Sequence, residues 1–399
     1  MGVSERWVRK LLLRMKAEAD AVVVHGLRGL ASNRKLAPET RQKALAVLRQ
    51  PEWHDFGPTF AAQQLGKQHG IHVGKETLRG WMSDAGMWEP GSRKLHEIHE
   101  WRPRRGGFGE LVQWDTSDHD WLEGRGPVRH LVRMIDDATS WSWGRFVESD
   151  ATRFNMAVLW EYIGKNGRIM DVYTDRDSMF TAARRKGENE QAGREVDRLT
   201  QLGRSLRGLG IGSIPANSPQ AKGRVERSFR TAQDRLVKQL RLVKICATEA
   251  ANAFLETEYW REWNESFARP VTDFPNRHRP LSDNQNLAAI LCHAEDRVIA
   301  NDYTFSFAGK RHRILREQAR AGMRGGRVRV ELRLDASLHA RYDGRYVTVA
   351  ECVAREAITV PTPPSSRNPP RKNHNAVGKS AWMRGFFDRP VPPLWKLIE

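Results

Sequence analysis

Three acidic residues stand where their carboxylates could hold metal ions together. Asp115 ends the apolar run Leu111–Trp114, Asp175 ends a run that begins at Ile169, and Glu226 lies early in a long amphipathic stretch. A carboxylate at the end of a buried strand is costly unless a partner such as a metal ion offsets its charge. Magnesium prefers oxygen ligands and keeps several waters, so a few carboxylates from separate elements suffice. Two such ions can activate the attacking oxygen and stabilise the leaving oxygen of a phosphodiester.

The elements around these acids predict an α/β core with a mixed sheet. Hydrophobic patterning predicts an antiparallel meander followed by a helix and a returning strand, with strands at 111–115, 129–137 and 141–147, a helix at 152–166 and a strand at 169–175. A further helix is predicted to begin at its N-cap candidate Ser218. Glu226 would border the buried face of this helix. Lys222 and Arg230, one turn either side of Glu226, would then hold phosphates.

Other acidic residues compete for the same roles. Asp136 and Asp137 fall inside the meander, where a structural turn role is favoured over that of the second acid. Asp118, Asp120 and Asp177 are accessory candidates. Any single aspartate at a strand end is more often a cap or turn residue, so the signal is the order strand-Asp, strand-Asp, helix-Glu.

The charge balance points to a polyanionic partner. The 399 residues contain 66 Lys and Arg against 48 Asp and Glu, a formal net charge of +18. An excess of this size favours nucleic acid over a solubilising surface, and the length favours several domains. No run approaches the ~20 apolar residues of a membrane span, and no signal peptide is visible. The three cysteines are far apart and fit a reducing cytoplasm.

The segment 1–105 predicts an all-α, helix-turn-helix DNA-binding region. Its first residues resemble the turn and second helix of such a motif, with Arg6, Arg9 and Lys10 free to reach DNA. An ordinary amphipathic helix fits equally well. Because the first helix of the motif is missing, the chain is expected to begin partway into its first module. The basic stretch 26–35 could lie along the DNA backbone or serve as a tether.

A second helix-turn-helix candidate follows in the same region. Three helices are predicted, at 38–49, 59–69 and 75–82. Thr77 and Arg79 on the last helix are candidate DNA contacts. A plain three-helix core is the alternative. The basic, breaker-rich stretch Trp101–Gly107 marks the boundary with the core at 106–280.

The segment 290–358 predicts a small β-barrel with one basic face, because apolar residues alternate with arginines there. A scaffold domain with solvated arginines is the alternative. The tail 359–399 is Pro-rich and basic, so we expect it to be disordered.

Four motifs of the core resemble the integrase-core (DDE) transposases of bacterial insertion sequences, relatives of retroviral integrases. The motifs are Gln113-Trp114-Asp115, Ile135–Thr139, Tyr173–Asp177 and Asn217–Arg227. The resemblance covers roughly 108–280 and implies an RNase H-like fold. It further implies that Asp115, Asp175 and Glu226 bind Mg²⁺, with Mn²⁺ able to substitute. Such enzymes cut DNA at the element ends and join the freed 3′-hydroxyl to target DNA.

The chain also departs from this pattern. A charged insert at 184–207 makes the interval between Asp175 and Glu226 longer than usual. Retroviral relatives carry a zinc module, but the four histidines between 69 and 99 have no cysteine companions here, so no zinc is expected. Cutting two ends in concert requires two active sites, so we expect a homo-oligomer on double-stranded DNA, within the bacterial cytoplasm and associated with the nucleoid. Two rival functions are a metal-dependent nuclease without joining activity and a catalytically inactive DNA-binding remnant.

Overall fold

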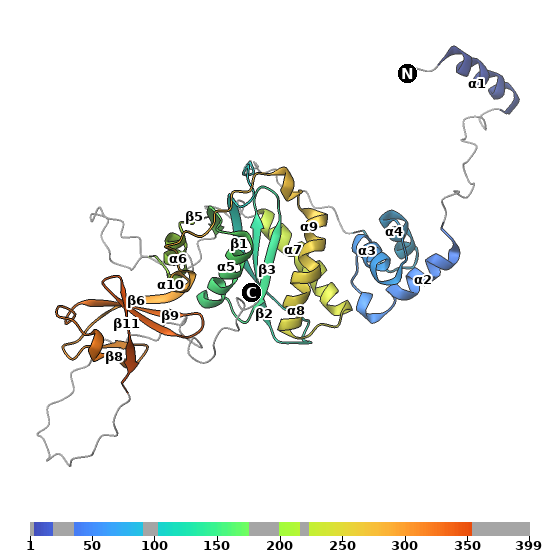
Figure 1. Cartoon of the computed structure of the whole chain (residues 1–399). Helices are drawn as coiled ribbons and strands as arrows, with labels where there is room; N and C mark the ends of the chain where they lie inside the picture. Colours follow the sequence, from blue (N-terminus) through green and yellow to red (C-terminus); the bar gives the residue numbers. More distant parts are fainter. Residues whose placement is uncertain (1–3, 19–35, 91–102, 175–198, 216–222, 353–399) are drawn as a thin grey trace, which may run out of the picture. The chain divides into compact units, whose positions relative to one another are not determined.

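The computed structural model describes residues 4–18, 36–90, 103–174, 199–215 and 223–352 (Figure 1). At 174, 215 and 223–227 it describes the backbone alone. The chain divides into an N-terminal unit, Met1–Leu95, and a C-terminal unit, His96–Glu399. The predicted linker at 26–35, the insert up to residue 198 and the tail at 359–399 lie outside the described residues. None of the described helices is long and apolar enough to span a bilayer.

The N-terminal unit contains one separate helix and a group of three. The helices are α1 (Glu5–Glu18), α2 (Pro38–Leu48), α3 (Pro58–His69) and α4 (Lys75–Asp84), with a 3₁₀ turn at Pro51–Trp53. Proline at the first positions of α2 and α3 favours their starts, and Gly70, in a left-handed conformation, ends α3. Phe60, Leu65 and Leu78 are buried between these helices. The three predicted helices of this region are therefore confirmed.

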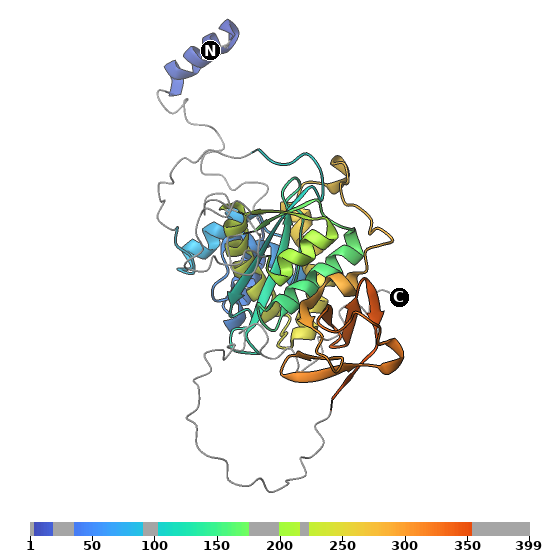
Figure 2. The same ribbon diagram turned by 90° about the vertical axis from the view of Figure 1, so that its left-hand side faces the viewer.

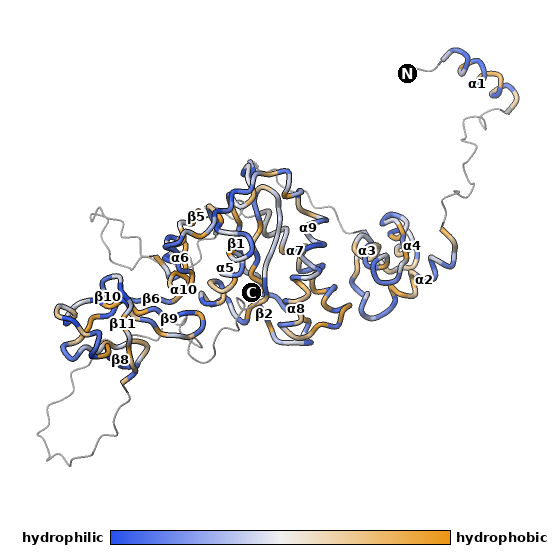
Figure 3. The backbone as a smooth tube through the Cα atoms, viewed as in Figure 1, coloured by the Kyte–Doolittle hydropathy of each residue, from blue (hydrophilic) through white to orange (hydrophobic). Residues whose placement is uncertain are grey.

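Helix α1 differs from the rest of its unit because its apolar residues are exposed. Trp7, Leu12 and Leu13 are all more than half exposed. Figure 3 shows apolar and polar residues alternating along this helix. The amide of Trp7 donates to Oγ of Ser4, so the predicted N-cap is present.

The C-terminal unit is built on a five-stranded mixed sheet in the order β3-β2-β1-β4-β5. Its strands are β1 (Leu111–His119), β2 (Arg129–Asp136), β3 (Ser142–Val147), β4 (Asp171–Thr174) and β5 (Gly212–Pro215). The first three pair antiparallel, whereas β4 pairs parallel with both β1 and β5. The predicted α/β class with a mixed sheet is confirmed.

Helices cover both faces of this sheet. They are α5 (Thr152–Asn166), α6 (Gln201–Leu209), α7 (Gly223–Leu242), α8 (Thr248–Phe254) and α9 (Trp260–Phe267), with a π-helical turn at Leu255–Tyr259. Helices α5 and α6 lie on one side of the sheet and α7 to α9 on the other (Figures 1 and 2). The π turn between α8 and α9 changes the direction of the side chains that follow it.

Strand β1 is longer than predicted. It continues to His119, because the polar residues beyond Asp115 keep pairing with β2, as in the pairs Asp118↔His130 and His119↔Arg129. Asp115 therefore lies in the middle of a strand and not at its end. Asp118 belongs to the same strand.

The C-terminal β region contains two sheets in place of the predicted closed barrel. One sheet has the order β11-β10-β9-β6 and the other β12-β8-β7. The strands are β6 (Cys292–Val298), β7 (Thr304–Phe307), β8 (Lys310–Ile314), β9 (Arg327–Arg333), β10 (Leu338–Tyr342), β11 (Arg345–Val347) and β12 (Val349–Glu351). Short helical turns lie at Val271–Asp273, at Leu287–Ile290 (α10) and at Arg316–Gln318. The sheets enclose one apolar core that includes Phe305, Phe307 and Val330, but no ladder among the described strands joins them edge to edge.

Candidate active site

Asp115 occupies the centre of the sheet, on the face covered by α7. It is half-buried and lies directly opposite Arg133 of β2 in the antiparallel ladder, so the two side chains share a face. Oδ1 of Asp115 accepts a hydrogen bond from the amide of Thr116 at 3.1 Å. Two residues along the strand, Nε2 of Gln233 in α7 donates to Oγ of Ser117 at 3.2 Å. This contact shows that α7 runs over the β1 face that carries Asp115.

Arg133 places a buried positive charge on the same face. Its side chain donates to the carbonyl of Ser228 in α7 at 3.2 Å and to Oγ of Ser142 in β3 at 3.0 Å. Burial lowers the pKa of Arg133 to about 10, so the guanidinium stays charged at neutral pH. Its guanidinium lies over three aromatic rings, 4.3 Å from the centroid of Trp263, 5.3 Å from Trp260 and 5.7 Å from Phe229. This aromatic cage therefore joins the sheet to α7 and α9 around a cation.

The other two acids of the predicted set are only partly covered by the structure. Glu226 lies in the first described turn of α7, where the backbone alone is described. Asp175 directly follows Thr174, the last residue of β4, and lies outside the described residues. Within the part of the chain that is described, no group of three or more potential metal ligands comes together. The three-acid site consequently stays a prediction.

Asp136 and Asp137 hold the turn after β2. Asp136 is buried and accepts hydrogen bonds from the amides of Gly109 and Thr139, each at 2.8 Å, and from Oγ1 of Thr139 at 2.7 Å. Burial raises the pKa of Asp136, although these hydrogen bonds favour its charged form. Asp137 accepts from Nε2 of Gln113 at 3.0 Å. Asp136 thus closes the turn through Thr139, whereas Asp137 joins the turn to β1 through Gln113.

The accessory candidates are peripheral or not described. Asp118 is exposed near the end of β1. Asp120 is exposed in the following turn, where its Oδ1 accepts from the amide of Gly124 at 3.2 Å. Asp177 lies outside the described residues.

The predicted DNA contacts of α1 and α7 are surface residues where they are described. Arg6, Arg9 and Lys10 are all exposed on α1, and Arg9 forms a 3.4 Å ion pair with Glu5. Arg230 is exposed on α7. Lys222 lies outside the described residues.

The two candidates of α4 have different surroundings. Thr77 is exposed. Arg79 pairs with Glu76 of its own helix and lies 5.4 Å from the ring centroid of Trp88. Thr77 is therefore the more accessible of the two, and Arg79 would have to exchange a local partner for DNA.

Sequence reasoning missed the role of Arg133. Its signal was an arginine inside the otherwise apolar run Leu131–Ile135 of a predicted strand. Trp260 and Trp263 are separated from it by more than a hundred residues, so their approach could be read only from the folded chain. The i, i+3 spacing of the two tryptophans placed them on one helix face, but not against a cation.

Comparisons with solved structures give retroviral neighbours. The chain is similar to a chain in the simian T-cell lymphotropic virus intasome in complex with PP2A regulatory subunit B56 gamma, at 12% identity and a TM-score of 0.33. That match covers 73% of this chain and 99% of the other. It is also similar to the catalytic core domain of BIV integrase, at 15% identity and a TM-score of 0.27, over 40% of this chain and 97% of that one.

Comparisons of sequence give closer relatives, although no protein-family model matches the chain. It is 26% identical over 343 residues to the transposase for insertion sequence IS1202 of Streptococcus pneumoniae, which covers 78% of this chain and 72% of that one. It is 39% identical over 347 residues to y4bF of Sinorhizobium fredii, a protein named as a transposase. That match covers 86% of this chain and 74% of the relative. As its core motifs indicated, the chain belongs to the transposases of bacterial insertion sequences.

Proposed function

We propose that the chain cuts the ends of its mobile element and joins the 3′ ends to target DNA by two-metal phosphoryl transfer. Asp115, Asp175 and Glu226 are the proposed ligands and catalytic residues. The observation that carries the proposal is the position of Asp115, half-buried at the centre of the sheet on the face that α7 covers.

The described backbone supports bringing the other two acids to this face. Arg133, opposite Asp115, holds the carbonyl of Ser228, which is only two residues after Glu226 in the sequence. Strand β4 pairs with β1 as far as Gln113↔Tyr173. In a parallel ladder, paired residues share a face. Asp115 and Asp175 each follow that pair by two residues in the sequence.

The chemistry of the proposed ligands suits magnesium. All three are carboxylates, and hard oxygen donors are what Mg²⁺ prefers, with Mn²⁺ an acceptable substitute. When bound, a pair of such ions activates the attacking oxygen and stabilises the leaving one. The charge of Arg133 on the same face would offset part of the repulsion between carboxylates before the metal binds.

DNA binding is proposed for several parts of the chain. The helical region 1–105, read as helix-turn-helix, would contact the terminal repeats through Arg6, Arg9, Lys10, Thr77 and Arg79. In the core at 106–280, Lys222 and Arg230 would hold phosphates beside Glu226. Two element ends require two active sites, so we propose a homo-oligomer on DNA, in the bacterial cytoplasm at the nucleoid.

Conservative substitutions of the three acids test this function. Asp115→Asn, Asp175→Asn and Glu226→Gln remove a charged ligand while keeping side-chain size. Each should lower strand transfer on element-end duplexes in Mg²⁺ by at least about 100-fold, because metal ligands act as a unit. Asp118→Asn, which changes an exposed acid of the same strand, is the matched control and should keep nearly full activity.

The products of the unaltered protein separate the alternatives. Cleaved DNA without joined products would indicate a metal-dependent nuclease. Binding of element ends without metal-dependent cleavage would indicate an inactive remnant. Full activity in all three acid variants would rule out the proposed site.

A further inference from the structure

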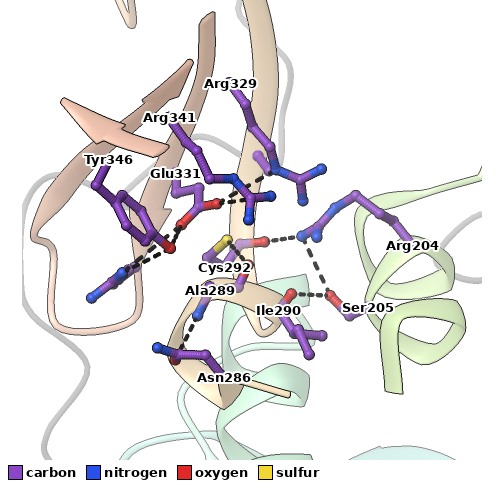
Figure 4. A network of polar contacts seen from close by, with 12 residues as sticks. Arg204, Ser205, Asn286, Ala289, Ile290, Cys292, Arg329, Glu331, Arg341 and Tyr346 are labelled. Carbon is purple, nitrogen blue, oxygen red and sulfur yellow. Dashed lines mark hydrogen bonds and ion pairs between the residues drawn. The ribbon is translucent and has the colours of Figure 1, made fainter. Parts of the chain in front are cut away.

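A fully buried glutamate lies among three arginines on the face of the sheet β11-β10-β9-β6 that points away from its apolar core (Figure 4). Oε1 of Glu331 is 3.5 Å from Nε of Arg329 and 3.8 Å from Nη2 of Arg341. Its Oε2 is 3.9 Å from Nη2 of Arg333. We call these four residues and Tyr346 the Glu331 cluster.

Strand register brings the cluster together. Arg329, Glu331 and Arg333 alternate along β9 and so project from one face, while Val328, Val330 and Leu332 project into the apolar core. On β10, Arg341 lies directly opposite Arg329, and on β11 Tyr346 lies opposite Arg341. The cluster therefore spans three neighbouring strands.

Tyr346 fixes the guanidinium groups in place. Its hydroxyl donates to Oε2 of Glu331 at 3.0 Å and accepts from Nη2 of Arg333 at 3.3 Å. The guanidinium carbons of Arg333 and Arg341 lie 5.6 and 6.0 Å from the centroid of its ring. The aromatic ring and the buried carboxylate thus restrict three flexible side chains.

Positive charge exceeds negative charge on this face. A fourth guanidinium, that of Arg204 in α6, donates to the carbonyl of Cys292 and to Oγ of Ser205 beside the cluster (Figure 4). Against these four cations stand Glu331, the exposed Asp296, which lies opposite Arg329 on β6, and the exposed Asp335, which interacts electrostatically with Arg333. The face therefore keeps a net positive charge.

The arginines remain accessible although they are held in position. The side chains of Arg329 and Arg341 are 33% and 35% exposed. Their ion pairs with Glu331 are long, so the carboxylate orients the guanidiniums without engaging every donor. A purely structural ion pair would join one cation to one anion, whereas this cluster contains more cations than anions. Fixed, partly exposed guanidinium groups are well suited to bind phosphates at a low entropic cost.

We propose that the Glu331 cluster binds the phosphate backbone of DNA, with Arg329 and Arg341 as the contacts and Glu331 as the residue that preorganises them. The inference rests on the proposed function only in taking DNA as the polyanion. It places a phosphate-binding surface on strands β9 and β10, which are not the elements that carry the three acids of the proposed active site.

Glu331→Gln distinguishes an effect of net charge from an effect of preorganisation, because the two predict opposite changes in DNA affinity. If net charge alone mattered, removing a negative charge would tighten DNA binding. If Glu331 preorganises the arginines, the same change should weaken binding, by about 5- to 10-fold. Glu351→Gln is the matched control, because Glu351 is exposed and pairs with Lys310 on the other sheet. The measurement is the Kd of a fluorescent duplex of unrelated sequence, without divalent metal, at several salt concentrations.

Two further variants keep the test decisive if Glu331→Gln unfolds the sheet, which circular dichroism would show. Arg329→Gln and Arg341→Gln each change a partly exposed side chain, and each should lower the slope of log Kd against log salt by about one. The proposal fails if Glu331→Gln binds DNA as tightly as Glu351→Gln does, or if both arginine variants keep the unaltered slope. Loss of strand transfer in Asp115→Asn and loss of duplex binding in Glu331→Gln are separate measurements, so either proposal can fail without the other.

Discussion

Arg133 is a fully buried cation on the sheet face that carries Asp115. Burying an isolated charge is costly, and here three aromatic rings and two oxygen acceptors compensate for the lost water. One of those acceptors, the carbonyl of Ser228, belongs to the helix that carries Glu226. We therefore regard Arg133 as a positioning residue, which fixes the start of α7 against the strand of Asp115.

Arg133→Met, which keeps the bulk and removes the charge, should lower strand transfer by about 10- to 100-fold. Its effect on stability should be small, within about 2 kcal/mol, because apolar replacement of a buried charge is often tolerated. Arg133→Lys keeps the charge without the planar fork, so it should recover part of the activity. The measurements are the strand-transfer rate at saturating DNA and the thermal unfolding midpoint of each variant.

Arg145→Met is the matched control for this prediction. Arg145 is also a buried arginine of the sheet, but it pairs with Glu161 at 3.1 Å. Removing it leaves Glu161 buried without its main partner, which should destabilise the fold by about 3–5 kcal/mol while the folded fraction stays active. If activity followed stability equally in both variants, Arg133 would have a structural role only.

Patterns in the sequence were sufficient to predict the bounds of some helices and strands but not of others. Helix α5 ends where Gly167 adopts a positive φ, a local effect that the sequence exposes. Strand β1 ran past its predicted end because pairing with β2 stabilises its polar half, which hydrophobic alternation cannot show. The order of the three acids along the chain could be predicted from the sequence, because each acid was assigned from the pattern of its own strand or helix. The cage of Arg133 was not, because its rings come from distant helices.

The connector, which is the segment that follows α9, contains a titratable side chain, that of His278. His278 lies against the rings of Phe108 and Tyr162, at 4.7 and 5.8 Å between centroids. Its Nε2 is 3.0 Å from the hydroxyl of Tyr162, and its Nδ1 is 2.8 Å from Oδ1 of Asn276. A side chain at Gly109 would collide with this imidazole, so glycine is required there. The connector is thus locked to the sheet by a neutral ring.

Acidification should loosen this connector. Burial lowers the pKa of His278 to about 4, whereas in the unfolded chain the ring takes a proton near its ordinary value of 6.5. Between these values the unfolded state binds more protons, so the stabilisation is present above pH 6.5 and is lost as the pH falls towards 4. Thermal unfolding midpoints from pH 7.5 to 4.5 should therefore decline more steeply for the unaltered chain than for His278→Gln. Parallel curves for the two proteins would contradict this.

The whole chain combines a high net charge with two separate compact units. A charge of +18 favours binding to any DNA, and such binding carries little sequence information. A transposase must also recognise its own ends. In our interpretation the N-terminal unit reads bases through α4, and the Glu331 cluster in the C-terminal unit holds phosphates.

Thr77→Ala and Arg341→Gln should therefore change DNA binding in different ways. Thr77 is exposed on α4, so its loss should lower the preference for element-end DNA over scrambled DNA by about 5- to 10-fold, the value of one base contact. Arg341→Gln should weaken binding to both duplexes equally, because phosphates are the same in every sequence. Thr59→Ala, an exposed threonine at the start of α3, is the control for α4. Measured at one salt concentration, an equal loss on both duplexes for Thr77→Ala would leave α2 to α4 as a plain three-helix core.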